Sequence, residues 1–372
     1  MKQNKVSSFI ILASFVVVLC CSWLLWFFLE KICDATNYEN REPSVQPQLT
    51  VDNYDTFPKE YEQWFDDSMP FRNNLIKMNS LIDYIIFKKS SNDNVIIGSD
   101  NWLFYKSQSD GDPLSCYQGT NLLTTDELDE IAQNCIKQRD ILTDMGKEFV
   151  ILIAPNKERM YSEYMPDYYG DPSENYAAKQ IADYLSETTD LRVIYLYDDL
   201  MYAKNSLNYN IFYKMDTHWN SIGAYVGASV LLKELGIIIP DIESNELTIS
   251  VDSNYSGDLA NMLDLNKELS FADHSYSISG YDMHEVQLID NDFQSVISYS
   301  ATGADPRKLY VLRDSFSSAM APYIGSQFCS TYLRHRGSYT YSDFLEQDPD
   351  IVVYEVVERY IGELRSFSVM GE

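Results

Sequence analysis

Two short segments of this sequence hold residue types that together can make a hydroxyl group reactive. Asp216 and His218 stand two positions apart in the segment Met215–Asn220, and Ser315 follows the apolar run Leu309–Leu312. Near neutral pH an imidazole can take the proton of a serine hydroxyl, and a carboxylate beside it can fix its tautomer and stabilise its charged form. The three residues are therefore candidates for a nucleophile, a general base and an orienting acid.

Each of these residues also has a structural interpretation. Ser315 stands where a helix is expected to begin, so its hydroxyl can serve as a helix N-cap. A single histidine in a globular domain is more often structural, and Trp219 can pack on a sheet, shield a site or stack on a sugar. The polar loop that places His218 between Asp216 and Trp219, ahead of a predicted helix, favours chemistry for the histidine.

Alternating strands and helices have to position these residues. Apolar runs bounded by turn residues predict strands at 149–154, 192–197, 309–312, 328–333 and 351–357, after a hairpin at 95–105. Helical patterns fall at 57–90, 124–145, 173–189, 222–235 and after Ser315. This alternation predicts an α/β fold with a mostly parallel sheet covered by helices on both faces. Because open sheets of this kind bind ligands at the carboxyl ends of their strands, the end of 309–312 is the expected place for a site.

Charge and cysteine content exclude several classes of protein. The chain has 28 Lys plus Arg against 56 Asp plus Glu, a formal net charge of −28, which repels phosphate backbones and makes nucleic acid a poor partner. The 6 Cys form no CxxC pair, and neither they nor the 4 His have the spacing of metal ligands. We therefore expect no metal and no cofactor, while a disulfide among Cys116, Cys135 and Cys329 stays open.

The N-terminus predicts a membrane anchor. At about 1.5 Å per residue, the apolar stretch from Val6 to Leu29 is long enough to span the ~30 Å hydrocarbon core. Lys2 and Lys5 precede it and acidic residues dominate after it, which keeps the N-terminus in the cytoplasm. No small-residue cleavage site follows, which disfavours a cleaved signal peptide. We therefore predict a single-pass protein of the cell membrane with a cytoplasmic tip and anchor (1–29), a linker (30–56) and an extracytoplasmic domain (57–372).

The order of several segments resembles the SGNH hydrolase-like family of the alginate O-acetyltransferases AlgJ and AlgX, and most of all the "DHHW" proteins of Gram-positive bacteria. The resemblance spans about residues 55–365 and rests on Asp216-Thr217-His218-Trp219 before a helix and on Asp314-Ser315-Phe316 near the end. Supporting segments are 57–72, 98–105, 155–161, 257–262 and 349–360. The Asp/His block precedes the Ser block, as in the circularly permuted AlgX-like branch.

Two positions depart from the family pattern. Thr217 replaces the second His of the "DHHW" label, which is not a proposed catalytic position, and Arg313 stands where the usual Gly-Asp-Ser block has Gly. The Gly and Asn blocks that complete an oxyanion hole do not align, so the amide of Ser315 is the one donor expected there.

The resemblance implies an SGNH-like fold and an O-acetyltransferase that modifies a cell-surface or secreted polysaccharide. Ser315 would carry the acetyl group, His218 would act as base and Asp216 would orient it, with a membrane-bound O-acyltransferase as the acetyl donor. Candidates for substrate binding are Trp219, Tyr161, Asn156, Lys157 and Arg334. Two other functions stay open, an esterase that uses the same three residues and a non-catalytic glycan-binding or assembly subunit.

Overall fold

The computed structural model of the chain describes residues 9–17, 20, 44–68, 72–281 and 284–371. Its contacts divide the chain into two compact units, Met1–Ser91 and Asn92–Glu372. The predicted helical periodicity at 57–90 is confirmed, and these helices belong to the first unit. They are α2 (Phe57–Asp67), α3 (Arg72–Ile82) and the π-helical segment η2 (Asp83–Phe87).

The predicted membrane anchor falls mainly on residues whose structure is not described. Within the ranges that are described, no helix is both long and apolar enough to cross a membrane. The span from Val6 to Leu29 lies largely outside those ranges, and residues 30–43 of the predicted linker also lie outside them. The anchor, the linker and the extracytoplasmic location therefore stay predictions.

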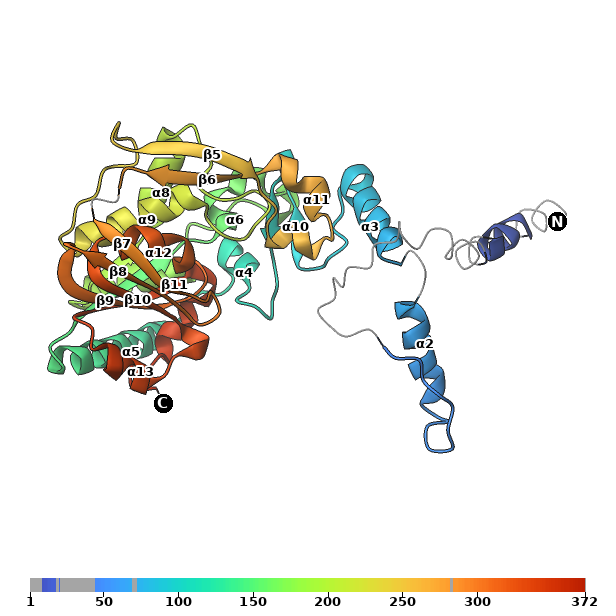
Figure 1. Cartoon of the computed structure of the whole chain (residues 1–372), viewed down its shortest axis with the longest axis horizontal. Helices are drawn as coiled ribbons and strands as arrows, with labels where there is room; N and C mark the ends of the chain where they lie inside the picture. The colour runs from blue at the N-terminus through green and yellow to red at the C-terminus, as the bar shows by residue number, and fades with distance from the viewer. Residues whose placement is uncertain (1–8, 18–19, 21–43, 69–71, 282–283, 372) are drawn as a thin grey trace. The chain divides into compact units, whose positions relative to one another are not determined.

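The second unit is built on a seven-stranded sheet with the order β4-β3-β11-β9-β10-β8-β7. Figure 1 labels β7 to β11 of this sheet. Its strands are β3 (Glu148–Ala154), β4 (Val193–Tyr195), β7 (Glu285–Asn291), β8 (Val296–Thr302), β9 (Asp305–Arg313), β10 (Phe328–His335) and β11 (Ile351–Val357). The five strands from β4 to β10 run parallel, and β8 and β7 are antiparallel additions. The predicted α/β fold is confirmed, and β3, β11 and β9 end at one edge of the sheet.

Helices cover both faces of this sheet because the side chains of its central strands alternate between two cores. Leu152 and Ala154 of β3 belong to one core, and Ile151 and Ile153 belong to the other. In Figure 1 the first face is covered by α8, α9 and α12 and the second by α5 and α13. The helices of this unit include α4 (Pro113–Gln118), α5 (Thr125–Asp144), α6 (Lys157–Met160), α7 (Ala177–Thr188), α8 (Tyr197–Ser206), α9 (Ser221–Glu234), α10 (Asp258–Met262), α11 (Asn266–Leu269), α12 (Ser317–Gly325), α13 (Tyr341–Gln347) and the 3-10 segment η8 (Glu358–Arg365).

Two antiparallel strand pairs lie outside the main sheet. The predicted hairpin at 95–105 is confirmed as β1 (Val95–Ile97) paired with β2 (Leu103–Tyr105). The sequence did not predict the second, β5 (Thr248–Asn254) paired with β6 (His274–Ser279). Most side chains of β5 are exposed. The apolar–polar alternation that signals a half-buried strand is therefore weak there.

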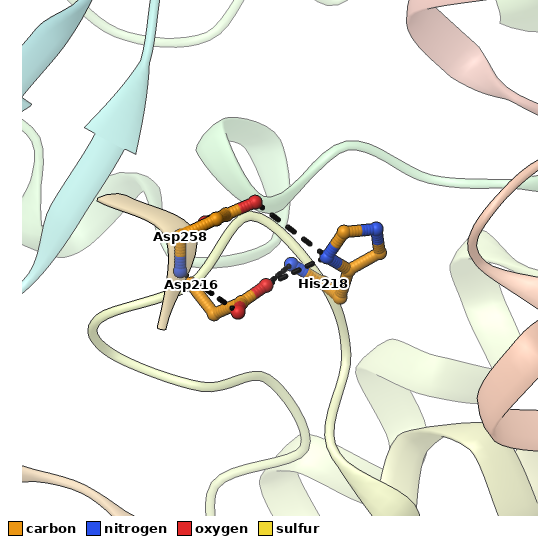
Figure 2. A group of neighbouring side chains, drawn as sticks. All are labelled: Asp216, His218 and Asp258. Atoms are coloured by element: carbon orange, nitrogen blue, oxygen red, sulfur yellow. Dashed lines mark hydrogen bonds and ion pairs between the residues drawn. The ribbon is translucent and has the colours of Figure 1, made fainter. Parts of the chain in front are cut away.

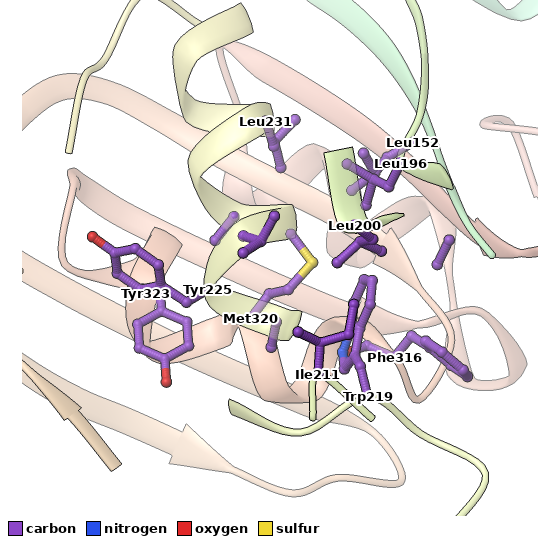
Figure 3. Close-up of a cluster of buried hydrophobic side chains, with 14 of the residues drawn as sticks. Leu152, Leu196, Leu200, Ile211, Trp219, Tyr225, Leu231, Phe316, Met320 and Tyr323 are labelled. Atoms are coloured by element: carbon purple, nitrogen blue, oxygen red, sulfur yellow. The ribbon is translucent and has the colours of Figure 1, made fainter. Parts of the chain in front are cut away.

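The core on the α9 and α12 side reaches directly beneath the end of β9. Trp219 and Phe316 are completely buried and pack edge to face at 5.2 Å, beside Ile211 and Met320 (Figure 3). Burying one large apolar side chain contributes about 1.5 to 3 kcal/mol. Trp219 directly follows His218, and Phe316 directly follows Ser315. This core therefore anchors both predicted site segments.

Candidate active site

The structure brings the three predicted residues into one hydrogen-bonded series. Nε2 of His218 lies 2.7 Å from the hydroxyl oxygen of Ser315, and its Nδ1 lies 2.6 Å from Oδ1 of Asp216. Ser315 is exposed although its neighbours Asp314 and Phe316 are buried. This is the geometry in which a carboxylate orients an imidazole and the imidazole takes the proton of a hydroxyl.

Ser315 lies in a tight turn between β9 and α12 that backbone hydrogen bonds hold. The carboxylate of Asp314 accepts the amide hydrogen of Phe316 at 2.9 Å and that of Val357 at 2.8 Å, which ties the turn to the end of β11. Helix α12 begins at Ser317 with Phe316 at the N-cap position and no side-chain cap. The alternative that Ser315 is an N-cap is therefore not realised.

His218 lies on a loop that its own sequence closes before α9. Phe212 and Trp219 form a β-bridge across the loop, and the amide of Tyr213 donates to the carbonyl of His218 at 3.2 Å. Asn220 then caps α9, since its side-chain oxygen accepts the amide hydrogens of Ile222 and Gly223. The loop thus presents His218 at a fixed position relative to a helix start.

Asp216 is held as a carboxylate from several sides. Its Oδ2 accepts the hydroxyl of Tyr255 at 2.9 Å and the amide of Asp258 at 3.1 Å, and its Oδ1 also accepts the amide of His218 at 2.9 Å. A Cβ on Gly257 would lie 2.4 Å from Cβ of Asp216, so only glycine permits this close approach. Burial alone would raise the pKa of Asp216, but the hydrogen bond to His218 and the charge of His218 bring it below its usual value.

The pKa of His218 responds to the same neighbours. Burial would lower it, and the charge of Arg359 acts in the same direction. The hydrogen bond to Asp216 and the negative charges of Asp216 and Asp258 outweigh these effects, so the pKa of His218 is raised above its ordinary value. The imidazole is therefore a stronger base than an isolated histidine.

Asp258 is a second carboxylate at this imidazole that the sequence analysis did not assign (Figure 2). Its Oδ2 lies 3.7 Å from Nδ1 of His218 and accepts the hydroxyl of Thr217 at 2.6 Å. Asp216, His218 and Asp258 each place a possible metal ligand within 4.8 Å of the others. Two ligands of a tetrahedral zinc ion, each about 2 Å from the metal, lie about 3.3 Å from one another. Nδ1 of His218 and Oδ1 of Asp216 are closer than this, at 2.6 Å. The observed contacts fit an oriented imidazole better than a metal site.

A buried acid lies directly beneath the Ser315 turn. Glu355 on β11 is fully buried, and its Oε2 accepts the amide hydrogen of Asp314 at 3.1 Å. Burial, followed by the negative charge of Asp314, raises the pKa of Glu355 well above its ordinary value. The buried carboxyl group of Glu355 therefore holds its proton more tightly beneath the nucleophile candidate.

Trp219 and Lys157 do not have the substrate contacts that the sequence analysis gave them. The indole N–H of Trp219 donates to the carbonyl of Phe316 at 3.0 Å within the core. The ammonium of Lys157 is buried and donates to the backbone carbonyls of Leu103, Lys214 and Asp216, and burial lowers the pKa of Lys157 to about 8. Both side chains support the loop that carries His218 instead of facing a ligand.

The other three substrate-binding candidates are also engaged within the protein. Tyr161 is buried, and its hydroxyl accepts the amide hydrogen of Ile211 at 2.8 Å. Arg334 is paired with Asp343 at 2.8 Å. Asn156 is buried at the end of β3, where its Oδ1 accepts the amide of Arg359 at 3.3 Å. These contacts hold Tyr161, Arg334 and Asn156 within the protein, and their predicted roles in substrate binding stay predictions.

Comparison with known proteins points to one family. Residues 95–290, just over half of the chain, match the family described as SGNH hydrolase-like domain, acetyltransferase AlgX. The chain is 26% identical over 240 residues to a probable alginate O-acetylase AlgJ of Pseudomonas syringae pv. tomato, which covers 60% of this chain and 54% of that protein. A probable alginate O-acetylase AlgJ of Pseudomonas putida is 26% identical over 215 residues, covering 56% and 51%. The chain thus spans about half the length of the curated relatives it matches.

Solved structures share the fold. A DHHW family protein from Eubacterium siraeum superposes with a TM-score of 0.52 at 12% identity, over 75% of this chain and 99% of the other. PatB1 of Bacillus cereus, solved with a sulfonyl adduct, gives a TM-score of 0.51 at 15% identity, over 74% and 99%. Asp216 and His218 lie inside the matched range 95–290, and Ser315 lies beyond it.

Proposed function

Because the chain belongs to the family of the SGNH hydrolase-like domain of the acetyltransferase AlgX, we propose that it is a serine-dependent O-acetyltransferase. The observation that carries the proposal is the hydrogen-bonded series from Asp216 through His218 to Ser315. A non-catalytic binding subunit has no need for an exposed hydroxyl held against an oriented imidazole.

The first half of the reaction transfers an acetyl group to the enzyme. Nε2 of His218 takes the hydroxyl proton of Ser315 while Oγ forms a bond to the acetyl carbonyl carbon. The carbonyl π pair moves onto oxygen, giving a tetrahedral oxyanion, and Asp216 stabilises the imidazolium. The oxyanion then collapses, the bond to the donor's leaving oxygen breaks, and His218 returns the proton to that oxygen.

The second half transfers the acetyl group to a sugar. His218, neutral again, takes a proton from a sugar hydroxyl, and that oxygen attacks the acetyl carbon of acetyl-Ser315. Collapse of the second tetrahedral intermediate breaks the bond to Oγ, and His218 gives its proton back to Ser315. The raised pKa of His218 fits a base that must act twice in each cycle.

The proposed acceptor is a polysaccharide outside the cell, and the proposed donor is a membrane-bound O-acyltransferase. The similar proteins from Pseudomonas are named as probable alginate O-acetylases, which supports a glycan hydroxyl as the acceptor class. The predicted anchor at Val6–Leu29 would hold the domain beside a donor in the same membrane.

Hydrolysis is the second candidate reaction, and one observation favours it. The side chain of His218 is 28% exposed, so water can reach the position from which an acceptor hydroxyl would attack. An esterase would use the same residues with water in place of the sugar.

A single assay with an aryl acetate ester separates the candidates. We expect the wild-type protein to release the aryl alcohol and, with an oligosaccharide present, to form acetylated sugar at the expense of free acetate. Free acetate alone would identify an esterase. Ser315→Ala should lose both products, and a sulfonyl fluoride should label Ser315 in the wild type, in line with the sulfonyl adduct of PatB1. A wild-type protein without either activity or label would be the binding subunit.

A further inference from the structure

Arg359 is a partly buried cation at the same sheet edge as Ser315. It follows β11 directly, and β11 pairs with β9 in parallel, with Tyr354 opposite Leu312. Its guanidinium carbon lies 5.5 Å from the centre of the Phe316 ring, and the His218 ring lies 4.9 Å from the same ring. The cation and the base therefore contact one side chain, the immediate neighbour of Ser315.

The backbone and stem of Arg359 are held in place from two sides. Its amide donates to Oδ1 of Asn156 at 3.3 Å. On the other side, a Cβ on Gly111 would come within 2.9 Å of Cγ of Arg359, so the 110–111 loop packs against the stem. The hydroxyl of Tyr360 donates to the carboxylate of Asp110, which fixes this loop. The guanidinium is thus positioned by its surroundings, as a preorganised donor has to be.

Among the described residues, Arg359 has no carboxylate paired directly with it, unlike two comparable arginines. Arg159 pairs with Glu358, and Arg336 pairs with Asp314. Among the residues that the structure describes, no carboxylate lies within 4.0 Å of the Arg359 guanidinium, and its Nε is buried without a hydrogen-bond partner. The hydroxyl and ring of Tyr360 contact the guanidinium, and the charges of Asp314 and Glu158 act on it from farther away. Because none of these is a carboxylate bound directly to the guanidinium, an anion that forms beside Ser315 can still bind there.

We propose that Arg359 is a catalytic residue that binds the oxyanion of the tetrahedral intermediate, together with the amide of Ser315. The inference rests on the proposed function and extends it to the group that stabilises the transition state. When Oγ of Ser315 adds to the acetyl carbonyl, one negative charge develops on that oxygen and one positive charge on His218. Arg359 binds the oxygen through its N–H groups and transfers no proton.

Three substitutions of Arg359 test this role with a neutral aryl acetate as substrate. Arg359→Gln and Arg359→Ala should lower kcat by about 100-fold to about 1,000-fold, as loss of one oxyanion donor does, with little change in KM. Arg359→Lys keeps the charge without the planar fork, so its kcat should fall between those of Arg359→Gln and the wild type. Guanidinium, added far below the concentrations that unfold the protein, should restore part of the kcat of Arg359→Ala. It should not increase the kcat of the wild type.

Arg365→Gln is the matched control, because it removes a guanidinium from the same segment, η8. Arg365 is exposed and pairs with Glu127 and Glu130, so its loss should leave kcat unchanged. Thermal unfolding of every variant shows whether a low kcat reflects an unfolded chain. If Arg359→Ala unfolds, the folded Arg359→Lys and Arg359→Gln variants still give the comparison.

Three results would overturn the inference while leaving the proposed function intact. These are a wild-type kcat in Arg359→Gln, a rise in KM alone, and an absence of rescue by guanidinium in a folded Arg359→Ala protein. A rise in KM confined to acidic sugars would assign Arg359 to a carboxylate of the acceptor instead. Failure of the proposed function gives a different pattern, because the wild type itself would then lack activity and Ser315 would not be labelled.

Discussion

The indole N–H of Trp219 donates a hydrogen bond of 3.0 Å to the carbonyl oxygen of Phe316, which lies 97 positions further along the chain. Each of these residues is next to a member of the proposed triad, His218 in one case and Ser315 in the other. The bond therefore joins the two segments that must stay aligned for proton transfer. Fixing reacting groups in this way contributes to catalysis beyond its effect on stability.

Replacing Trp219 by Phe should lower both stability and activity. The carbonyl of Phe316 would lose this hydrogen bond and keep only that from the amide of Ala319 at 3.3 Å, which costs about 0.5 to 1.5 kcal/mol in the free energy of unfolding. Urea unfolding and kcat for an aryl acetate measure the two effects. Trp102→Phe is the matched control, since Trp102 is equally buried but its indole nitrogen has no hydrogen-bond partner. Equal losses of stability and of kcat in the two variants would show that these effects come from the size of the ring and not from the hydrogen bond.

Lys157→Met should destabilise the protein without a specific effect on substrate affinity. Its buried ammonium serves three backbone carbonyls, so its loss should cost about 3 kcal/mol or more. Lys214→Met is the control, because the Lys214 ammonium donates to one carbonyl, that of Asp100, at 3.3 Å. Urea unfolding of the two variants gives the comparison. A normal unfolding free energy with a raised KM in Lys157→Met would restore the original substrate-binding prediction.

Asp258→Asn should move the activity profile toward lower pH. The negative charge of Asp258 helps to raise the pKa of His218, so its removal lowers that pKa and frees the base at lower pH. The acid limb of kcat/KM for an aryl acetate reports this shift. Glu130→Gln, which changes an exposed acid on α5, should leave the profile in place. An unmoved limb in Asp258→Asn would mean that Asp258 does not act on the imidazole.

Glu355→Gln should become more stable relative to the wild type as pH rises. In the folded chain the pKa of Glu355 is raised well above its ordinary value of 4.5. The wild-type protein therefore loses stability as the pH rises from the pKa of Glu355 in the unfolded chain toward its pKa in the folded chain. Glutamine is neutral at every pH, so the Glu355→Gln variant does not lose this stability. Urea unfolding of both proteins at about pH 5 and about pH 8 measures the difference. A difference that stays constant between the two conditions would contradict a neutral Glu355.

Much of the fold could be predicted because its central strands carry continuous apolar runs. The strand at 149–154 is buried on both faces, so every position is apolar after Glu148 and the run stands out in the sequence. The strand β5 is largely exposed and β7 lies at the sheet edge, so neither leaves such a signal. Pattern reasoning therefore found the parallel centre of the sheet and missed its antiparallel margin.

The site was predictable where a local pattern marks its residues, as the end of an apolar strand does for Ser315. Asp216 and His218 meet across two positions, so their spacing carried the signal. Asp258 reaches Thr217 from 41 positions away, and no local pattern marks that contact. Lys157 follows a Pro-Asn pair that suggests an exposed loop, and its burial depends on carbonyls that lie 54 to 59 positions away.

The most direct test of the account is the covalent state of Ser315 during turnover. We expect rapid quenching with an aryl acetate, followed by peptide mass spectrometry, to find one acetyl group on Ser315 of the wild-type protein. In His218→Ala the acetyl group should form far more slowly, and in Ser315→Ala no site should replace it. Full turnover without acetyl-Ser315, or wild-type turnover by Ser315→Ala, would contradict the account.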